Sequence, residues 1–145
     1  MPRIVRPMVF DPQEPTSPLI GTTKNCLGVR TSGKRRDVDI DASGNVELNR
    51  KGLSVSHDWR KLPAFLIPEH LEDEHNGASG KGMRVFVHGG NTGAFVEGPV
   101  AAGLELLFKH GCTTAGVVCP AVVVPLEQYQ RDLAATRPDW VIDEG

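Results

Sequence analysis

The sequence predicts a β-rich α+β fold, formed by a single domain with one C-terminal helix. Three observations support this prediction: Leu53–Ser56 alternates apolar with polar residues, Met83–His88 reads as a strand, and residues 126–136 have a helical period. The length of 145 residues fits one domain with a substantial core. We expect residues 26–145 to form this domain. Residues 1–25 are expected to form an irregular N-terminal arm, because five prolines fall within the first twenty positions.

Short strands separated by turns are predicted in the first half of the chain. Cys26–Arg30 is the first apolar run. Residues 37–40 and 46–48 alternate on either side of the turn-forming residues 41–45, a pattern that predicts a hairpin. The next expected strand is Leu53–Ser56.

The second half of the chain contains the clearest strand and the predicted helix. Met83–His88 is predicted as a strand, and residues 103–108 and 117–124 are further apolar runs. Pro125 opens the helix without loss of a hydrogen bond, since the first turn has free N–H groups in any case. Leu126, Tyr129 and Leu133 then mark its buried face.

Two serines lie on one face of the strand Leu53–Ser56. Because side chains alternate along a strand, Leu53 and Val55 share one face, and Ser54 and Ser56 share the other, about 7 Å apart. Two neighbouring hydroxyl groups suit a polar ligand. They equally suit a solvated sheet face, so both interpretations remain open.

Charge and composition exclude several classes of protein. The chain has 39% hydrophobic and 23% charged residues, which is typical of a globular protein, and no apolar run is long enough to span a membrane. Its net charge is −2. The triplet 34–36 is basic but is followed at once by acidic residues, so we expect no nucleic-acid partner.

Cysteines and histidines show no metal-ligand spacing, so no metal site is predicted. Three cysteines leave one without an intramolecular partner and indicate free thiols in a reducing, cytoplasmic compartment. His110 lies two positions from Cys112, which keeps a cysteine hydrolase as a minor alternative.

Arg30 ends the first predicted strand, where an arginine can bind a phosphate through two parallel hydrogen bonds. The alternative is a surface ion pair with Asp37 or Asp39. The residues alone leave both possibilities open.

Several short motifs resemble a toxin family of type VI secretion systems whose members look like ADP-ribosyltransferases. The motifs are Leu27–Arg30, Gly52–Val55, Leu62-Pro63, Pro120-Ala121 and Leu126–Tyr129, and the resemblance covers roughly residues 26–140. The chain also resembles a set of uncharacterised bacterial proteins, which share Gly52–Val55 with Leu62-Pro63, and Tyr129-Gln130 with Leu133, Thr136 and Trp140. The resemblance implies a split β-sandwich that binds NAD in a cleft, in a toxin or toxin–antitoxin component of the bacterial cytoplasm, in some cases delivered into another cell.

The resemblance also implies roles for particular residues. Arg30, Ser54 and Ser56 would bind NAD, with Ser54 bracing the strand at the nicotinamide ribose. The family has a histidine in the register of Ala115, and the nearest one here is His110. Glu105 and Glu127 are the candidates for the acidic catalytic residue, and Glu105 is preferred because it interrupts an apolar strand. The alternative is that Glu105 is an outward-facing strand residue without a catalytic role.

Enzymatic activity, as an ADP-ribosyltransferase or NAD hydrolase, is therefore an expectation that rests on the resemblance. An immunity or antitoxin protein is the implied partner, and the oligomeric state stays open. The alternative function is a non-enzymatic binding module that uses the same cleft.

Overall fold

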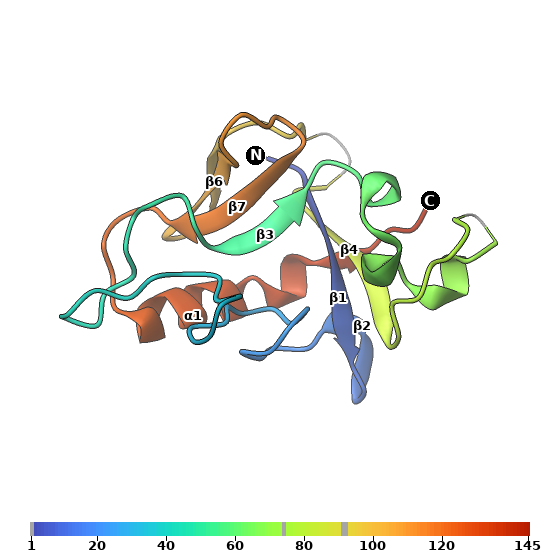
Figure 1. Cartoon of the computed structure of the whole chain (residues 1–145), viewed down its shortest axis with the longest axis horizontal. Helices are drawn as coiled ribbons and strands as arrows, with labels where there is room; N and C mark the ends of the chain where they lie inside the picture. Colours follow the sequence, from blue (N-terminus) through green and yellow to red (C-terminus); the bar gives the residue numbers. More distant parts are fainter. Residues whose placement is uncertain (1, 74, 91–92) are drawn as a thin grey trace.

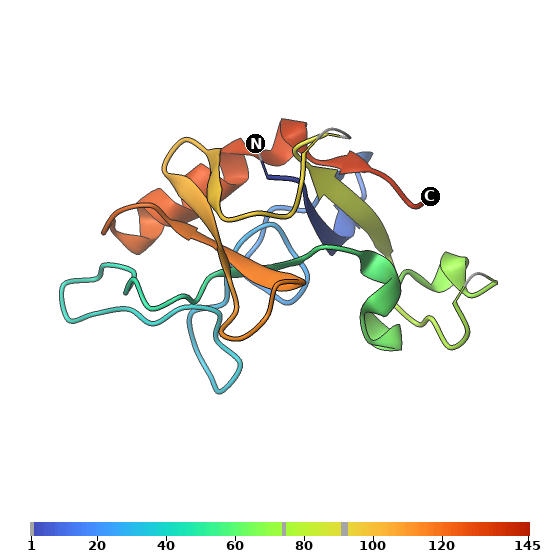
Figure 2. The same cartoon turned by 90° about the horizontal axis from the view of Figure 1, so that it is seen from above.

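The computed structural model describes residues 2–73, 75–90 and 93–145. The strands in these ranges form one antiparallel sheet of eight strands, curled into a half-barrel, with seven in the order β5-β6-β7-β3-β1-β4-β8 and β2 paired with β1 (Figures 1 and 2). The strands are β1 (Ile4–Asp11), β2 (Glu14–Pro18), β3 (Leu53–Ser56), β4 (Met83–His88), β5 (Gly98–Ala101), β6 (Leu104–Phe108), β7 (Ala115–Pro120) and β8 (Val141–Ile142).

Helix α1 (Leu126–Ala135) packs along one face of the sheet (Figure 1). Tyr129 and Leu133 lie one turn apart and are almost fully buried, at 0% and 1% exposure. They join the main core, which contains residues from β1, β3, β4, β6 and β7. The hydroxyl of Tyr129 donates to the carbonyl of Val118 and accepts from the N–H of Leu53, which fixes the helix to two neighbouring strands. No helix in the described ranges is long and apolar enough to cross a membrane.

A smaller core covers the opposite face of β1 and β4. Val5, Val85 and Val87 point into it, because side chains alternate along both strands. The segment between β3 and β4 supplies its cover through three short 3₁₀ turns, η1 (Trp59–Lys61), η2 (Ala64–Leu66) and η3 (Glu69–Leu71). A fourth, η4 (Arg137–Asp139), follows α1.

The prediction of an irregular arm at residues 1–25 is wrong. β1 lies inside the sheet between β3 and β4, so this segment belongs to the same domain as the rest of the described chain. Pro7 is tolerated there because its backbone nitrogen faces the β3 side, where pairing is recorded only at Val5. Two residues further on, the N–H of Val9 already bonds to the carbonyl of Asn25.

The predicted strand at Cys26–Arg30 is also absent. Only an isolated bridge between Ile20 and Leu27 is formed. The side-chain amide of Gln130 in α1 takes the place of a partner strand, since it accepts from the N–H of Val29 at 3.1 Å and donates to its carbonyl at 3.0 Å. A Cβ atom on Gly28 would lie 2.0 Å from the carbonyl oxygen of Gly21, so only glycine fits this close approach.

The predicted hairpin at residues 37–48 is reduced to one bridge, Ile40 with Val46. Its turn is formed as expected: the carboxylate of Asp41 accepts from the N–H groups of Ser43 and Asn45, both at 2.9 Å. The N–H of Glu47 still donates to the carbonyl of Asp39 at 2.9 Å, whereas the N–H of Val46 bonds to the carbonyl of Val124 at 3.0 Å, outside the hairpin.

Four predicted elements are confirmed with nearly the expected bounds. β3 and β4 match their predicted ranges, β6 starts one residue later than expected, and α1 ends one residue earlier. Trp140 packs back on the core at 3% exposure. The coarse prediction of a β-rich domain with one C-terminal helix is therefore correct.

Candidate functional site

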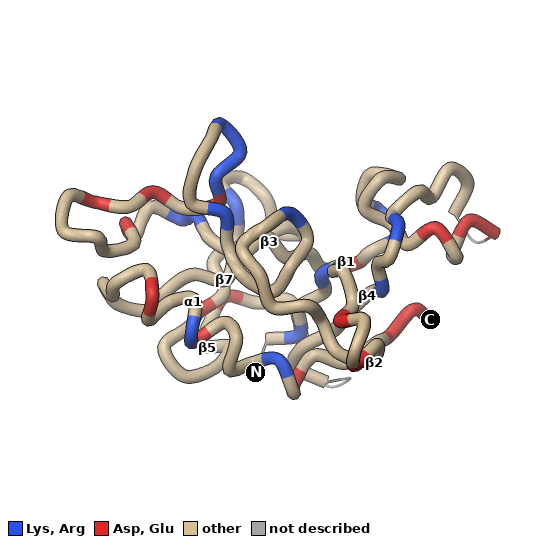
Figure 3. Tube along the Cα trace, turned by 90° about the horizontal axis from the view of Figure 1, so that it is seen from below, with Lys and Arg blue, Asp and Glu red and all other residues tan. Residues whose placement is uncertain are grey.

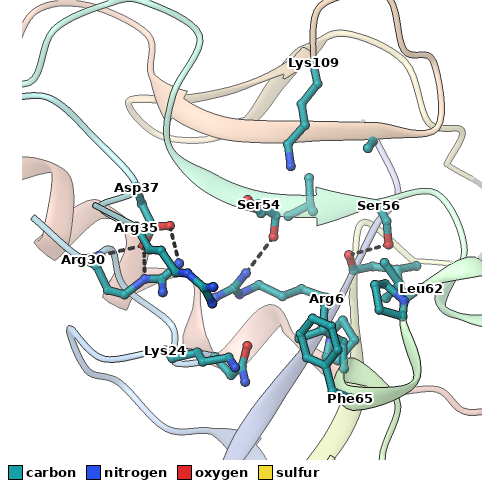
Figure 4. Close-up of a pocket in the computed structure, with 17 residues that line it drawn as sticks. Arg6, Lys24, Arg30, Arg35, Asp37, Ser54, Ser56, Leu62, Phe65 and Lys109 are labelled. Carbon is teal, nitrogen blue, oxygen red and sulfur yellow. Dashed lines mark hydrogen bonds and ion pairs between the residues drawn. The ribbon is translucent and has the colours of Figure 1, made fainter. Parts of the chain in front are cut away.

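A pocket of about 370 Å³ lies beside β3 and β1. Its basic and acidic lining residues are Arg6, Lys24, Arg30, Arg35, Lys109 and Asp37. Five basic side chains therefore face one carboxylate, although the whole chain has a net charge of −2. Figure 3 shows basic positions on the loops around β3, and Figure 4 shows the labelled side chains converging on the pocket. We call this site the basic pocket.

Arg6 forms the inner end of the basic pocket. It points from β1 beneath β3, where its guanidinium donates to the carbonyl of Ser54 at 2.8 Å and to that of Cys26 at 3.0 Å (Figure 4). Its Nε is enclosed and has no hydrogen-bond partner. Burial lowers the pKa of Arg6 to about 10, so it remains charged at neutral pH. Arg6 therefore places a positive charge at the inner end of the pocket, where it attracts a bound anion.

Arg30 also lines the basic pocket, together with Ser54, as expected from the sequence. Its guanidinium, however, forms an ion pair with Asp37, through Nη2 at 3.1 Å and Nε at 3.3 Å. The same carboxylate accepts the backbone N–H of Arg30 at 2.7 Å. The ion-pair alternative considered for Arg30 is therefore present, and Arg30 offers a ligand less free charge than its neighbours do.

Lys24, Arg35 and Lys109 form no ion pair within the described residues. They come from three separate segments of the chain and line one pocket. Lys24 lies 5.1 Å from the ring centre of Phe65, within range of a cation–π interaction. Together these side chains supply positive charge at the mouth, while Arg6 supplies it inside.

One wall of the basic pocket is apolar. It is formed by Leu62, Pro63, Phe65 and Leu66, which belong to the turns after β3. Phe65 is 55% exposed, a large value for an aromatic side chain, and stands at the rim. A flat hydrophobic surface beside a group of cations suits a ligand with both an aromatic and an anionic part.

Ser54 and Ser56 both line the basic pocket. Ser54 is partly exposed, whereas Ser56 is only 6% exposed. The hydroxyl of Ser56 lies 3.5 Å from the carbonyls of Val5 and Asp58, at the outer limit for a hydrogen bond. The hydroxyl of Ser54 is the more accessible of the two. Leu53 and Val55 are both in the main core, as the alternation predicts.

The remaining sequence candidates lie outside the basic pocket. Glu105 is on β6, opposite Pro99 and Cys119, and lines neither the basic pocket nor the depression beside it. His110 is exposed and lines a neighbouring depression that also contains Ser54. The sequence-predicted group of Ser54, His110 and Glu105 is thus not assembled in one cavity.

Cys112 offers little support for the hydrolase alternative. Its thiol lies 3.3 Å from the hydroxyl of Thr114, and hydrogen bonding to Thr114 lowers its pKa. No hydrogen bond joins Cys112 to His110 in the described part of the chain. Cys26 and Cys119 are buried and free, and burial raises the pKa of Cys119 to about 11. No group of three or more potential metal ligands is found among the described residues.

Sequence reasoning missed Arg6, Lys24, Arg35, Phe65 and Lys109 as pocket residues. One signal was present: residues 1–52 carry nine Lys and Arg against six Asp and Glu. The convergence of these residues depends on β1 lying next to β3, which the proline-rich N-terminus concealed.

Comparison with known proteins gives no match to a family model, to a curated protein or to a solved structure. A function is therefore inferred from the geometry and charge of the site itself.

Proposed function

We propose that the basic pocket binds a nucleotide, and that the nucleotide is NAD. The observation that carries the proposal is the group of five basic side chains beside an apolar wall that ends in the exposed ring of Phe65. Phosphate is best bound by arginine and lysine, and a nucleobase or nicotinamide ring stacks on an aromatic side chain. The two halves of the pocket match the two halves of such a ligand.

The residues of the pocket fit a nucleotide in their chemistry. The unpaired Arg35 and Lys24 would bind phosphate oxygens, and the positive charge of Arg6 would attract them from inside the pocket. The accessible hydroxyl of Ser54 would bond to a ribose hydroxyl or a phosphate. Phe65 would cover a ring at the rim. Arg30 would add a weaker electrostatic attraction for the phosphates, because its charge is paired with that of Asp37.

The finer proposal is an ADP-ribosyltransferase-like toxin or effector that acts in the bacterial cytoplasm and is neutralised by an immunity or antitoxin partner. When bound, NAD supplies the nicotinamide–ribose bond whose cleavage transfers ADP-ribose. Ser54 would hold the ribose, and His110 would act from the neighbouring depression. Glu105 lines neither the basic pocket nor that depression, so the proposal assigns it no role.

A second candidate is a non-enzymatic module that binds the same nucleotide. The observation in its favour is that Asp37 is the one carboxylate among the described pocket residues, and it is already bonded to Arg30. A transferase normally uses a carboxylate to stabilise the positive charge that develops on the ribose. Binding is thus supported by more observations than catalysis is.

Calorimetric titration with NAD tests the binding proposal. We expect Arg35→Ala and Lys24→Ala each to weaken binding by about tenfold, because a charge-assisted hydrogen bond contributes about 1.5–3 kcal/mol. Lys34→Ala is the matched control: Lys34 is an exposed neighbour of Arg35 that does not line the pocket. Affinity should also fall as salt is raised. Wild-type protein that binds no nucleotide at low salt would refute the proposal.

Expression in a bacterial host separates the toxin from the binding module. A toxin should slow growth and lower cellular NAD, and Arg35→Ala should weaken both effects in a protein that is still folded. Arg35→Lys should restore them only in part, since lysine lacks the planar guanidinium. Arg30→Ala should have a smaller effect, because the Arg30 guanidinium is paired with Asp37. Normal growth at high soluble expression of the wild-type protein would favour the non-enzymatic module.

A further inference from the structure

A second depression, of about 430 Å³, adjoins the basic pocket. It shares Asp37, Ser54 and Lys109 with that pocket, so the two cavities meet along β3. We call it the adjoining depression. Its own lining includes Arg36, Asn49, Lys51 and His110.

Asp39 fixes one wall of the adjoining depression. Its carboxylate bonds to Arg36 at 2.8 Å, to Lys51 at 2.8 Å and to Asn49 at 2.9 Å. These hydrogen bonds, that from Lys51 foremost, hold the pKa of Asp39 well below its usual range. Arg36, Asn49 and Lys51 are thereby held in one arrangement by Asp39. Because these side chains are already ordered, less conformational entropy is lost when a ligand binds.

The junction between the two cavities is basic and has free donors. Lys109 lines both cavities and points towards β3 near Ser54 (Figure 4). Neither Lys109 nor His110 forms a side-chain hydrogen bond or ion pair within the described ranges. Asp37, the carboxylate at the junction, is already bonded to Arg30. An anionic group at the junction would therefore find an unoccupied ammonium group and a serine hydroxyl.

We infer that the two cavities form one composite site for a dinucleotide, with the pyrophosphate at the Lys109–Ser54 junction and one nucleoside on each side. The inference rests on the proposed nucleotide binding and adds the residues that receive the second half of the ligand. The basic pocket offers Phe65 and an apolar wall to one ring. The adjoining depression offers Asn49 and His110, whose polar groups suit ribose hydroxyls and a base edge.

This arrangement predicts selectivity for ligand length. A mononucleotide occupies one cavity and leaves the other solvated, whereas a dinucleotide fills both and places two phosphate charges at Lys109. Binding energy from the second nucleoside comes without a second loss of translational freedom, so the longer ligand gains affinity.

Titration of the whole chain with AMP, ADP-ribose and NAD tests the inference. We expect NAD and ADP-ribose to bind at least about tenfold more tightly than AMP. His110→Ala should weaken NAD binding by about threefold or more and leave AMP binding unchanged. Lys109→Ala should weaken both pyrophosphate ligands by about tenfold. His57→Ala is the matched control, because His57 is exposed and lines neither cavity.

The outcomes distinguish the inference from the proposed function. If AMP and NAD bind equally well, and His110→Ala and Lys109→Ala bind NAD like the wild type, nucleotide binding stands and the composite site is refuted. If no nucleotide binds, the proposed function itself fails. Thermal unfolding of each variant shows whether a loss of affinity reflects a loss of fold, and Lys109→Gln provides a second, less disruptive variant of the junction.

Discussion

The guanidinium of Arg6 donates a hydrogen bond of 2.8 Å to the backbone carbonyl of Ser54, from beneath the strand that lines the basic pocket. The second donor of the same guanidinium holds the carbonyl of Cys26. Arg6 thus fixes the positions of β3 and of the loop that carries Lys24 and Arg30. One residue both places charge in the pocket and holds two of its walls.

Arg6→Met is expected to destabilise the protein by about 1–3 kcal/mol, because two partly buried carbonyls lose a charged donor. Part of this destabilisation is offset, because the variant no longer has to keep a charged group out of water. Urea unfolding measures the change. Equal or higher stability in the variant would mean that enclosing the guanidinium costs more than its hydrogen bonds contribute.

Tyr129→Phe should cost about 1–3 kcal/mol, although the ring volume is unchanged. The hydroxyl bonds to both Val118 and Leu53, and its removal leaves two buried backbone groups without partners. The free energy of unfolding is the quantity to compare. A stability equal to that of the wild type would show that water replaces the hydroxyl.

Leu133→Ala is expected to cost about 2–5 kcal/mol through a cavity beneath α1. Leu133 is 1% exposed and belongs to the main core. Glu127→Ala on the exposed side of the same helix is the control and should stay within about 0.5 kcal/mol of the wild type. Similar unfolding midpoints for the two variants would contradict the packing of α1 on the sheet.

His88 should make stability decrease as the pH falls below about 6.5. It is 2% exposed, neither ring nitrogen has a partner, and burial lowers its pKa from the ordinary value of 6.5. The unfolded chain therefore binds a proton first as the pH falls. Stability is fully present above pH 6.5 and is lost as the pH falls through the lower folded pKa.

The comparison variant for this effect is His88→Phe, which cannot titrate and keeps a ring beside Trp140. Its melting temperature should change less than that of the wild type between pH 7.5 and pH 5. Parallel curves for the two proteins would assign the pH dependence to other groups.

The sequence predicts the strands and helix that carry strong local patterns. Leu53–Ser56 alternates cleanly, Met83–His88 is rich in strand-forming residues, and Pro125 marks the start of α1. In each case the local pattern and the tertiary packing agree.

Where the sequence-based predictions are wrong, the reason is a contact between residues that are far apart in the chain. Pro7 suggests irregular structure, and only the sheet order shows that its backbone nitrogen faces the β3 side of β1, where Val5 is the residue that pairs with β3. Val29 resembles a strand residue, but its backbone partner is the side chain of Gln130 from more than a hundred positions away. The pocket itself joins Arg6, Ser54 and Lys109, whose spacing in the sequence contains no sign of their proximity.

Backbone amide NMR during a titration with NAD is the most direct test of nucleotide binding in the basic pocket. We expect the largest shift changes in residues 52–56, in the loop 24–37 and at 109–110, which contain residues that line the two cavities. Arg35→Ala should require more NAD to reach the same changes, and Lys34→Ala should not. Changes concentrated instead on the exposed side of α1, around Gln130 and Arg131, or no changes at all, would contradict nucleotide binding in the basic pocket.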